Sequence, residues 1–184
     1  MIDNILSLLI WIPIISGLVL LFCNKKTNFL NIYNIFINLV VLLLSVFLLI
    51  NFNNKNANFQ FIENIEWIPS LNIYYFLGVD AISVLLILLN TIIFFIVSLY
   101  NSTLRLEKQN QYYASFLISN GLAIGVFSAL DAILFYIFFE ALLIPMFLII
   151  GIWGGANRIY ASIKFFIYTF LGSILLLIAF LYIN

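Results

Sequence analysis

The chain has 184 residues, of which 66% are hydrophobic and 8% are charged, and its formal net charge is zero. Soluble domains contain about 45–50% apolar and about 25% charged residues, so this composition indicates a membrane protein. With one cysteine and no histidine, the chain cannot form an internal disulfide. We expect no zinc or haem site, no cofactor bound by this chain and no nucleic-acid partner.

The apolar stretches predict an all-α, polytopic membrane protein with a single transmembrane domain over residues 1–184. Each stretch approaches or exceeds the ~18–20 residues with which a helix crosses a bilayer, whereas a barrel strand would alternate polar and apolar residues. A segment rich in Asn, 51–76, is expected to be a loop, with Trp67 as an interfacial anchor and Pro69 in a turn. The expected helices cover residues 4–22, 29–50, 77–100, 112–129, 132–150 and 160–183.

The distribution of cations predicts the orientation. Lys55 is the one cation expected on the side that carries both termini and the 51–76 loop. Loops rich in Lys and Arg stay on the cytoplasmic or matrix side, so both termini are expected on the intermembrane-space side of a mitochondrial inner membrane, or outside a bacterial inner membrane. The loops after the first, third and fifth helices carry Lys25, Lys26, Arg105, Lys108 and Arg158.

An acidic residue, Glu140, stands in the middle of the fifth helix, within FYIFFEALLIPMF. A charge at that depth costs several kcal/mol unless it is paired, hydrated or protonated. Tyr136, one turn earlier, shares its face and could bond to it. Pro145 leaves the carbonyl of Ala141 without its helical donor, so water could bind there. Glu140 either bonds a neighbouring helix in its protonated form or handles protons, and we favour the second interpretation.

A cation also lies inside a helix. Tyr160, Lys164 and Tyr168 recur every four residues of the sixth helix and form a polar stripe. Lys164 could snorkel to the membrane interface, or it could pair with Glu140 directly or through water. Spacing alone leaves both interpretations open.

Other polar residues predict structural roles. Asp80 and Asp131 precede helices, where a carboxylate caps the free N–H groups. Asn and Ser residues on one face of the second helix predict hydrogen bonds between helices. Gly121 and Gly125 indicate close packing of the fourth helix.

Two stretches carry a family resemblance. FYIFFEALLIPMFLIIGIWGGANRIYASIKFFIYTFLGSILLL, 135–177, and GVDAISVLLILLNT, 78–91, resemble the chain 4 family of respiratory complex I, the proton-pumping NADH:ubiquinone oxidoreductase, and the likeness extends over about 67–184. The resemblance implies that the six helices form the first part of a fourteen-helix antiporter-like fold. It implies that Glu140 is an essential channel residue, and it favours Lys164 as the partner that modulates its proton affinity. FMN, iron–sulfur clusters and ubiquinone would be bound elsewhere in the complex.

The resemblance implies a function as well. We expect a non-redox membrane-arm subunit of the H⁺-translocating NADH:ubiquinone reductase, a translocase of the mitochondrial respiratory chain. The family's seventh and later helices lie beyond residue 184, so we expect a split subunit in which a separate chain supplies them beside other membrane-arm subunits. The alternatives are half of a monovalent cation/proton antiporter and a purely structural membrane-arm subunit.

Overall fold

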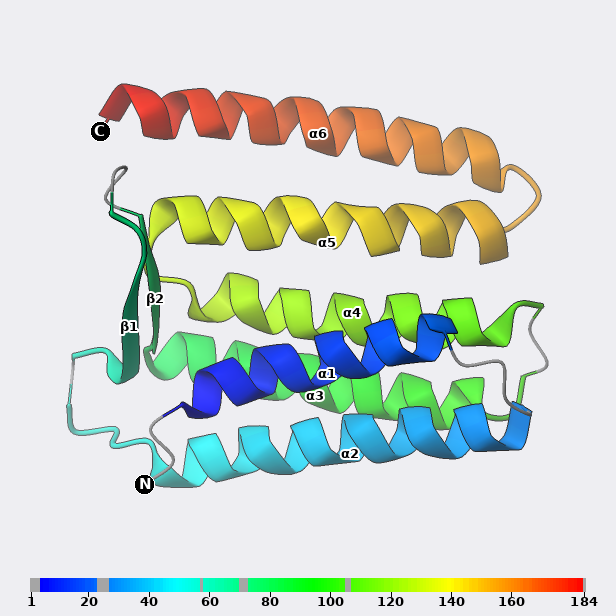
Figure 1. Cartoon of the computed structure of the whole chain (residues 1–184), viewed down its shortest axis with the longest axis horizontal. Helices are drawn as coiled ribbons and strands as arrows, with labels where there is room; N and C mark the ends of the chain where they lie inside the picture. The colour runs from blue at the N-terminus through cyan, green and yellow to red at the C-terminus, as the bar shows by residue number, and fades with distance from the viewer. Residues whose placement is uncertain (1–3, 23–26, 57, 70–72, 105–106, 184) are drawn as a thin grey trace.

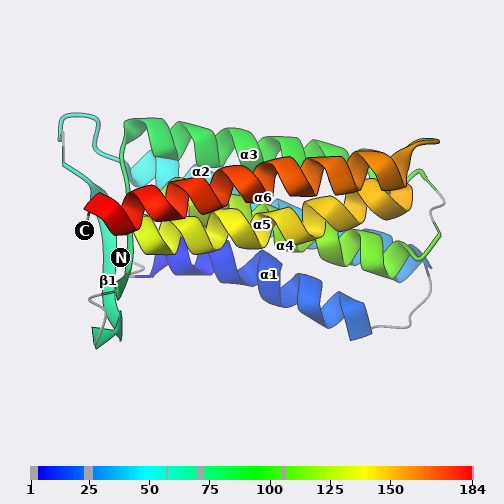
Figure 2. The same cartoon turned by 90° about the horizontal axis from the view of Figure 1, so that it is seen from above.

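The structure is a computed structural model that describes residues 4–22, 27–56, 58–69, 73–104 and 107–183. Its helices lie side by side as a bundle, and a β-hairpin lies across one end (Figures 1 and 2). The expected all-α, polytopic fold class is confirmed, since five of the helices are long and apolar enough to cross a membrane. The elements are α1 (Ile5–Phe22), α2 (Thr27–Asn51), β1 (Gln60–Ile68), β2 (Ile73–Val79), α3 (Ala81–Asn101), α4 (Gln109–Ser128), α5 (Ala132–Trp153) and α6 (Arg158–Ile183).

The helix α4 is the centre of the bundle. It packs against α1, α2, α3 and α5, and most of its side chains are buried. The other five helices are long and apolar enough to be candidate membrane spans. The helix α4 is not among these candidates, because it carries several polar residues. Neighbouring helices shield these residues from lipid, so α4 can cross the membrane without an apolar surface of its own. The buried polar residues of α4 are Gln109, Ser115, Ser119, Asn120 and Ser128.

Two glycines let α1 and α4 cross closely. A Cβ at Gly121 would lie 2.5 Å from the carbonyl oxygen of Ile10, and a Cβ at Gly17 would lie 2.8 Å from that of Ala114. Both obstacles are backbone atoms, which cannot turn aside as a flexible side chain can. The close packing predicted for Gly121 is therefore present, and its partner is α1.

We expect Gly121→Ala to lower the free energy of unfolding by about 1–3 kcal/mol, the usual cost of overpacking. Gly172→Ala is the matched control, because a Cβ at this helical glycine meets no atom within 4 Å. Thermal unfolding of the two variants in the same detergent measures the difference. Equal stability of both variants would contradict the close α1–α4 crossing.

The segment 51–76 is not the open loop that the sequence predicted. It contains β1 and most of β2, which pair antiparallel with Glu63 opposite Leu77 and Ile65 opposite Tyr75. Residues 77–79 belong to β2, so the third helix begins at Ala81 and not at 77. Leu77 and Val79 are fully buried, and the N–H of Leu130 donates to the carbonyl of Phe76 at 2.9 Å. The hairpin is thereby fastened to the α4–α5 connection.

A carboxylate from the hairpin caps α1. The pairing is irregular between Gln60 and Glu63, where Phe61 has a positive φ of 52°, and such a bulge re-aims neighbouring side chains. Glu63 is 5% exposed and accepts hydrogen bonds from the N–H groups of Leu6, at 2.8 Å, and Ser7, at 3.2 Å. It also accepts from the Ser7 hydroxyl. These N–H groups at the start of α1 have no partner within the helix, so Glu63 joins two distant parts of the chain.

Tyr75 extends this contact. Its hydroxyl lies 3.0 Å from Ser7 Oγ and accepts from Trp11 Nε1 at 3.2 Å. Burial raises the pKa of the Tyr75 phenol, so its hydroxyl stays protonated near neutral pH. The hairpin and the first two turns of α1 thus share one hydrogen-bonded cluster.

We expect Glu63→Gln to destabilise the fold by about 1–3 kcal/mol, because it replaces the charged acceptor of the α1 N–H groups with a neutral amide that binds them more weakly. Glu66→Gln, on the exposed part of the same strand, should change stability little. Thermal unfolding combined with limited proteolysis of the hairpin measures both effects. If Glu63→Gln matched Glu66→Gln, the capping role of Glu63 would be wrong.

Both predicted aspartate caps are present. Asp80 Oδ1 accepts from the N–H of Ser83 at 2.7 Å, and Asp131 Oδ1 accepts from the N–H groups of Ile133 and Leu134. The bond from Ser83 holds the pKa of Asp80 below its usual value. The Asp80 cap therefore stabilises α3 above the ordinary carboxyl pKa and is lost as the pH falls through the lowered value.

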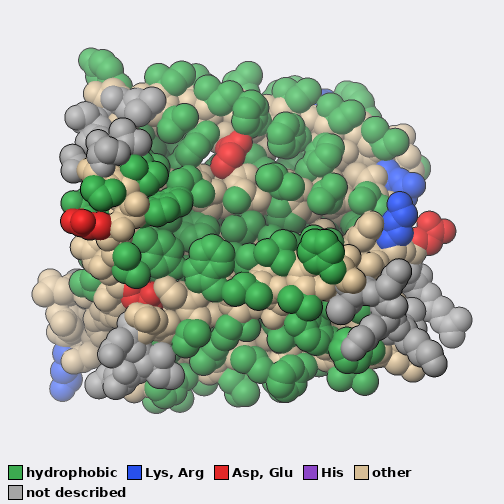
Figure 3. Space-filling view, in the orientation of Figure 1, with side chains coloured by type: hydrophobic (Ala, Val, Ile, Leu, Met, Phe, Trp, Pro, Cys, Tyr) green, Lys and Arg blue, Asp and Glu red, His purple; other side chains and the backbone are tan. Residues whose placement is uncertain are grey.

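The charged residues gather at the two ends of the bundle, and the flank between them is apolar apart from an acidic side chain (Figure 3). Lys108 and Arg158 lie at the α3–α4 and α5–α6 connections, whereas Lys55 precedes the hairpin at the opposite end. The α3–α4 and α5–α6 connections therefore lie at the same end of the bundle, as the predicted topology requires. Lys25, Lys26 and Arg105, on which the orientation also depends, lie outside the described residues.

Candidate functional site

Glu140 lies about 12 Å along α5 from its first residue, at 1.5 Å per residue, and it is half-buried. Its Oε2 atom is buried and has no hydrogen-bond partner. One turn to either side, Ile137 is 38% and Ile144 is 60% exposed, whereas Leu143 is buried. The carboxylate therefore lies where α5 passes from its packed face to its exposed flank.

The sequence predicted two residues beside Glu140 on α5, Tyr136 and Pro145. Tyr136 is half-buried, and among the described residues no hydrogen bond joins it to Glu140. Pro145 is buried inside a continuous α5, where it cannot donate to the carbonyl of Ala141. Two acceptors, the Glu140 carboxylate and this carbonyl, therefore lie within one turn of each other in the membrane.

The polar stripe of α6 faces outward. Tyr160 and Tyr168 are each 67% exposed, and Lys164 is exposed as well. The Lys164 ammonium lies 5.4 Å from the centroid of the Tyr160 ring, a cation–π distance. Within the described part of the chain no ion pair joins Lys164 to Glu140.

A chain of hydrogen-bonded amides links α2, α3 and α4, and all of its members except the half-buried Asn90 are buried. Asn90 Nδ2 donates to Asn120 Oδ1 at 2.9 Å, and Asn120 Nδ2 donates to Asn38 Oδ1 at 3.0 Å. Asn38 Nδ2 continues to Asn34 Oδ1 at 3.1 Å. The interhelical hydrogen bonds predicted for the second helix are therefore present. The sequence analysis did not identify Asn120, the central residue of this chain. The polar residues of its segment could have indicated a helix that is buried among others.

We expect Asn120→Leu to destabilise the bundle by about 1–3 kcal/mol, because it leaves the buried Asn38 oxygen and the half-buried Asn90 amide without their partner. Ser119→Ala is the matched control, since among the described residues this buried hydroxyl bonds only to the carbonyl of Ser115, within α4. Thermal unfolding in detergent compares the two variants. An Asn120→Leu variant as stable as Ser119→Ala would show that the amide chain does not hold the helices together.

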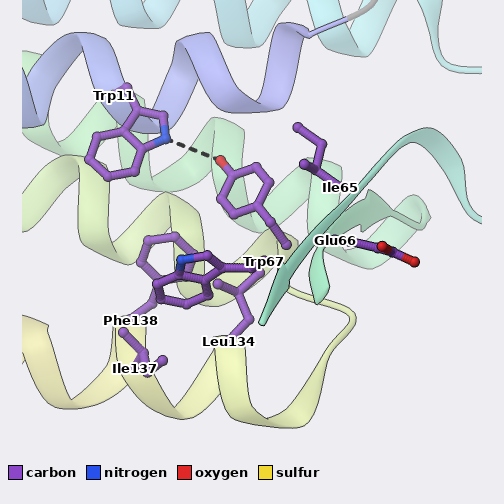
Figure 4. A pocket seen from close by; sticks show the side chains of 8 residues that line it. Trp11, Ile65, Glu66, Trp67, Leu134, Ile137 and Phe138 are labelled. Carbon is purple, nitrogen blue, oxygen red and sulfur yellow. Dashed lines mark hydrogen bonds between the residues drawn. The ribbon is translucent and has the colours of Figure 1, made fainter. Parts of the chain in front are cut away.

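No described residues form a metal site, since no group of three or more His, Cys, Asp or Glu side chains comes together among them. The hollow beneath the hairpin, about 420 Å³ in volume, is apolar. Figure 4 shows Trp11, Trp67, Ile137 and Phe138 around it, while the Glu66 side chain points away. This hollow therefore offers no charged group for chemistry, and Glu140 is the candidate functional group of the described chain.

Known proteins resemble the chain in sequence and in fold. The family described as NADH:quinone oxidoreductase/Mrp antiporter, TM, matches residues 129–184, which hold α5 and α6. NADH-quinone oxidoreductase subunit M of Rickettsia typhi is 39% identical over 97% of this chain and 38% of that protein. NADH-ubiquinone oxidoreductase chain 4 of Arabidopsis thaliana is 41% identical over 97% of this chain and 36% of that protein. The chain is similar in sequence to subunit M and chain 4 proteins over little more than a third of their length.

A solved structure supports this relationship. A chain of respiratory complex I from Thermus thermophilus with bound NADH matches with a TM-score of 0.78 and 25% identity, over 91% of this chain and 33% of that one. The present chain spans little more than a third of the length of the subunit M and chain 4 proteins that it matches. The predicted family resemblance is confirmed, and the matched segment contains both Glu140 and Lys164.

Proposed function

We propose that this chain is part of a membrane-arm subunit of respiratory complex I and contributes to proton translocation coupled to NADH oxidation and quinone reduction. The observation that carries the proposal is the Glu140 carboxylate, whose Oε2 atom is buried without a partner in the middle of α5. A carboxylate at this depth is costly and is usually found on an ion pathway. Glu140 takes up and releases protons in this proposal.

The position of Glu140 favours a pathway that other helices complete. It lies beside the exposed Ile137 and Ile144, and α6 next to it exposes most of its surface. The matched relatives are far longer than this chain. We propose that additional helices, carried by a separate polypeptide, cover the α5–α6 flank and bring a basic group and water to Glu140.

Lys164 is the candidate base of this chain. Its exposed ammonium can influence Glu140 through the field of a nearby charge, or more directly once the flank is covered and α6 is repacked. Moving one charge across 100 mV requires about 2.3 kcal/mol, which corresponds to about a fiftyfold change in proton affinity. Redox-driven rearrangements along the membrane arm would alternate Glu140 between tighter and weaker proton binding.

We also propose the membrane placement predicted from charge. The end with Lys108 and Arg158 faces the matrix or cytoplasm, and the hairpin end faces the intermembrane space or periplasm. Electron transfer would take place in other subunits, which bind FMN, iron–sulfur clusters and ubiquinone. A mitochondrial inner membrane and a bacterial inner membrane are both compatible with this placement.

We expect Glu140→Gln to abolish or strongly reduce proton pumping while the complex still assembles. Glutamine keeps the size and hydrogen-bonding capacity of the side chain but cannot bind and release a proton. The number of protons moved per NADH oxidised, in vesicles that contain the intact complex, measures the effect. Glu140→Asp should retain partial pumping, because it keeps a titrating carboxyl group.

The matched control is Glu66→Gln, which removes an exposed carboxylate from the hairpin and should leave pumping unchanged. Lys164→Met in the same assay tests the role of the Lys164 charge. This variant should pump fewer protons if Lys164 modulates the proton affinity of Glu140. Normal pumping by Glu140→Gln would reject the role of Glu140. Normal pumping by both Glu140→Gln and Lys164→Met would instead support a purely structural subunit.

The family match itself favours one second candidate, because its description includes Mrp antiporters. In this alternative the chain is half of a monovalent cation/proton antiporter that works without electron transfer. Purification of the chain in mild detergent separates the two functions. Flavin and iron–sulfur clusters that co-purify support complex I, and an isolated assembly without them supports the antiporter.

A further inference from the structure

The contact between the hairpin and α1 is a continuous chain of hydrogen bonds that ends on a buried acid. Trp11 Nε1 donates to the Tyr75 hydroxyl at 3.2 Å, and this hydroxyl lies 3.0 Å from Ser7 Oγ. Ser7 Oγ bonds in turn to Oε2 of Glu63, which is 5% exposed. The four residues come from α1, β2 and β1, so they form a latch between segments that lie far apart in the sequence.

The two end groups of the latch fix the direction of every bond in it. An indole N–H can only donate, and an ionised carboxylate can only accept. Ser7 therefore gives its one hydroxyl hydrogen to Glu63, and the hydrogen between Ser7 and Tyr75 comes from Tyr75. All hydroxyl groups of the latch are satisfied in this arrangement, as long as Glu63 is ionised.

A protonated Glu63 does not fit the same arrangement. The N–H groups of Leu6, at 2.8 Å, and Ser7, at 3.2 Å, already face its carboxyl oxygens, and donors cannot accept the new O–H. If this O–H donated to Ser7 Oγ, the Ser7 hydrogen would turn to Tyr75, and the Tyr75 hydrogen would lose its acceptor. Tyr75 lines the apolar hollow beneath the hairpin, where an unpaired polar hydrogen is costly. The latch therefore selects the ionised acid.

No neighbouring charge takes over the role of Glu63. Among the described residues its hydrogen bonds go to Leu6 and Ser7 of α1, and no cation pairs with it. From β2 the titratable group nearby is the Tyr75 phenol, whose pKa is raised by burial, so this group stays neutral near neutral pH. Glu66, on β1 itself, is exposed, and its side chain points away from the hollow (Figure 4).

The opposite side of the hairpin is fastened without Glu63. The N–H of Leu130 donates to the carbonyl of Phe76 at 2.9 Å, a backbone bond that does not titrate. The acids that precede α3 and α5, Asp80 and Asp131, bond to the N–H groups of their own helices. Loss of the Glu63 charge therefore weakens the α1 side of the hairpin and leaves the α4–α5 side in place.

The closed hairpin is also strained. Phe61 has a φ of 52° at the irregular pairing that precedes Glu63, and a residue with a Cβ adopts this left-handed region at a cost. The bonds from Glu63 to α1 offset this cost, and they weaken once the carboxylate becomes neutral.

We propose that Glu63 is a proton-operated latch, which holds the hairpin against α1 while it is ionised and releases it when it takes up a proton. The proton comes from the aqueous compartment at the hairpin end and binds to the Glu63 carboxylate, which then no longer accepts from Ser7. Release separates Tyr75 from Trp11 and opens the hollow, whose far wall contains Ile137, one turn of α5 before Glu140.

The latch has a use in the proposed membrane placement. The hairpin end there faces the compartment that receives the translocated protons, so acidification of this compartment would loosen the hairpin. This use rests on the proposed function, whereas the latch itself does not.

Amide hydrogen exchange in the intact membrane assembly tests the latch without turnover. The pH is lowered from about 8 to about 4, a range that spans the titration of ordinary glutamates. Wild type and Glu63→Gln are compared at the same pH, so that the effect of pH on exchange itself cancels. At high pH we expect the N–H groups of Leu6 and Ser7 to be about tenfold more protected in the wild type, the difference between a charged and a neutral acceptor. At low pH the two proteins should become equal.

A second variant tests the direction of the hydrogen bonds. Tyr75→Phe removes the hydroxyl group that donates to Ser7, so Ser7 can accept from a protonated Glu63 at no further cost. The loss of protection between high and low pH should therefore be smaller than in the wild type. Tyr74→Phe is the matched control, because Tyr74 is the neighbouring tyrosine of β2 and pairs with Glu66. This control should keep the full response.

Fluorescence of Trp11 gives a second measurement that does not require Glu63→Gln to assemble. The full chain with Trp67→Phe and Trp153→Phe retains Trp11 as its one tryptophan. Its emission should move to longer wavelength on acidification, because release from Tyr75 brings water to the indole.

Wild-type protection of Leu6 and Ser7 that stays above that of Glu63→Gln at low pH would overturn the proposal. Trp11 emission that does not change with pH would also overturn it, and so would a full response in Tyr75→Phe. Neither measurement involves proton pumping, which is tested separately by Glu140→Gln. The latch and the proposed function can therefore fail independently.

Discussion

The structure depends on one constraint, that a polar group inside the hydrocarbon layer must find its partner within the protein. The side-chain amides of Asn38, Asn90 and Asn120 bond to one another across three helices. Glu63 satisfies the free N–H groups at the start of α1. Among the described residues three buried side-chain atoms lack a partner, namely Asn34 Nδ2, Asn101 Nδ2 and Glu140 Oε2, and Glu140 is the acid among them.

The same constraint explains which parts of the fold the sequence predicted. Long apolar runs reveal helices directly, and a carboxylate just before such a run reveals a cap, as Asp80 and Asp131 do. The hairpin was missed because an Asn-rich stretch leads into β1, and because the end of β2 runs almost directly into the apolar sequence of α3. Its stability comes from contacts with Leu6, Ser7 and Leu130, which no local pattern contains.

The candidate site was predictable only in part. Glu140 could be identified because an acid in an apolar run has few explanations, and the structure places it inside α5, about 12 Å from the first residue of the helix. The relation to Lys164 could not be derived in this way, since spacing along two helices does not fix how they face each other. Lys164 lies over Tyr160 on the outer face of α6, so a direct contact with Glu140 would require α6 or the Lys164 side chain to rearrange.

The central claim is that Glu140 gains and loses a proton as the assembly works. Infrared difference spectroscopy of the intact membrane complex, recorded before and during NADH oxidation, measures this directly through the carboxylic acid stretch. We predict a band that changes with turnover in the wild type and is missing in Glu140→Gln. A spectrum in which the two proteins give the same carboxyl bands under turnover would contradict the claim.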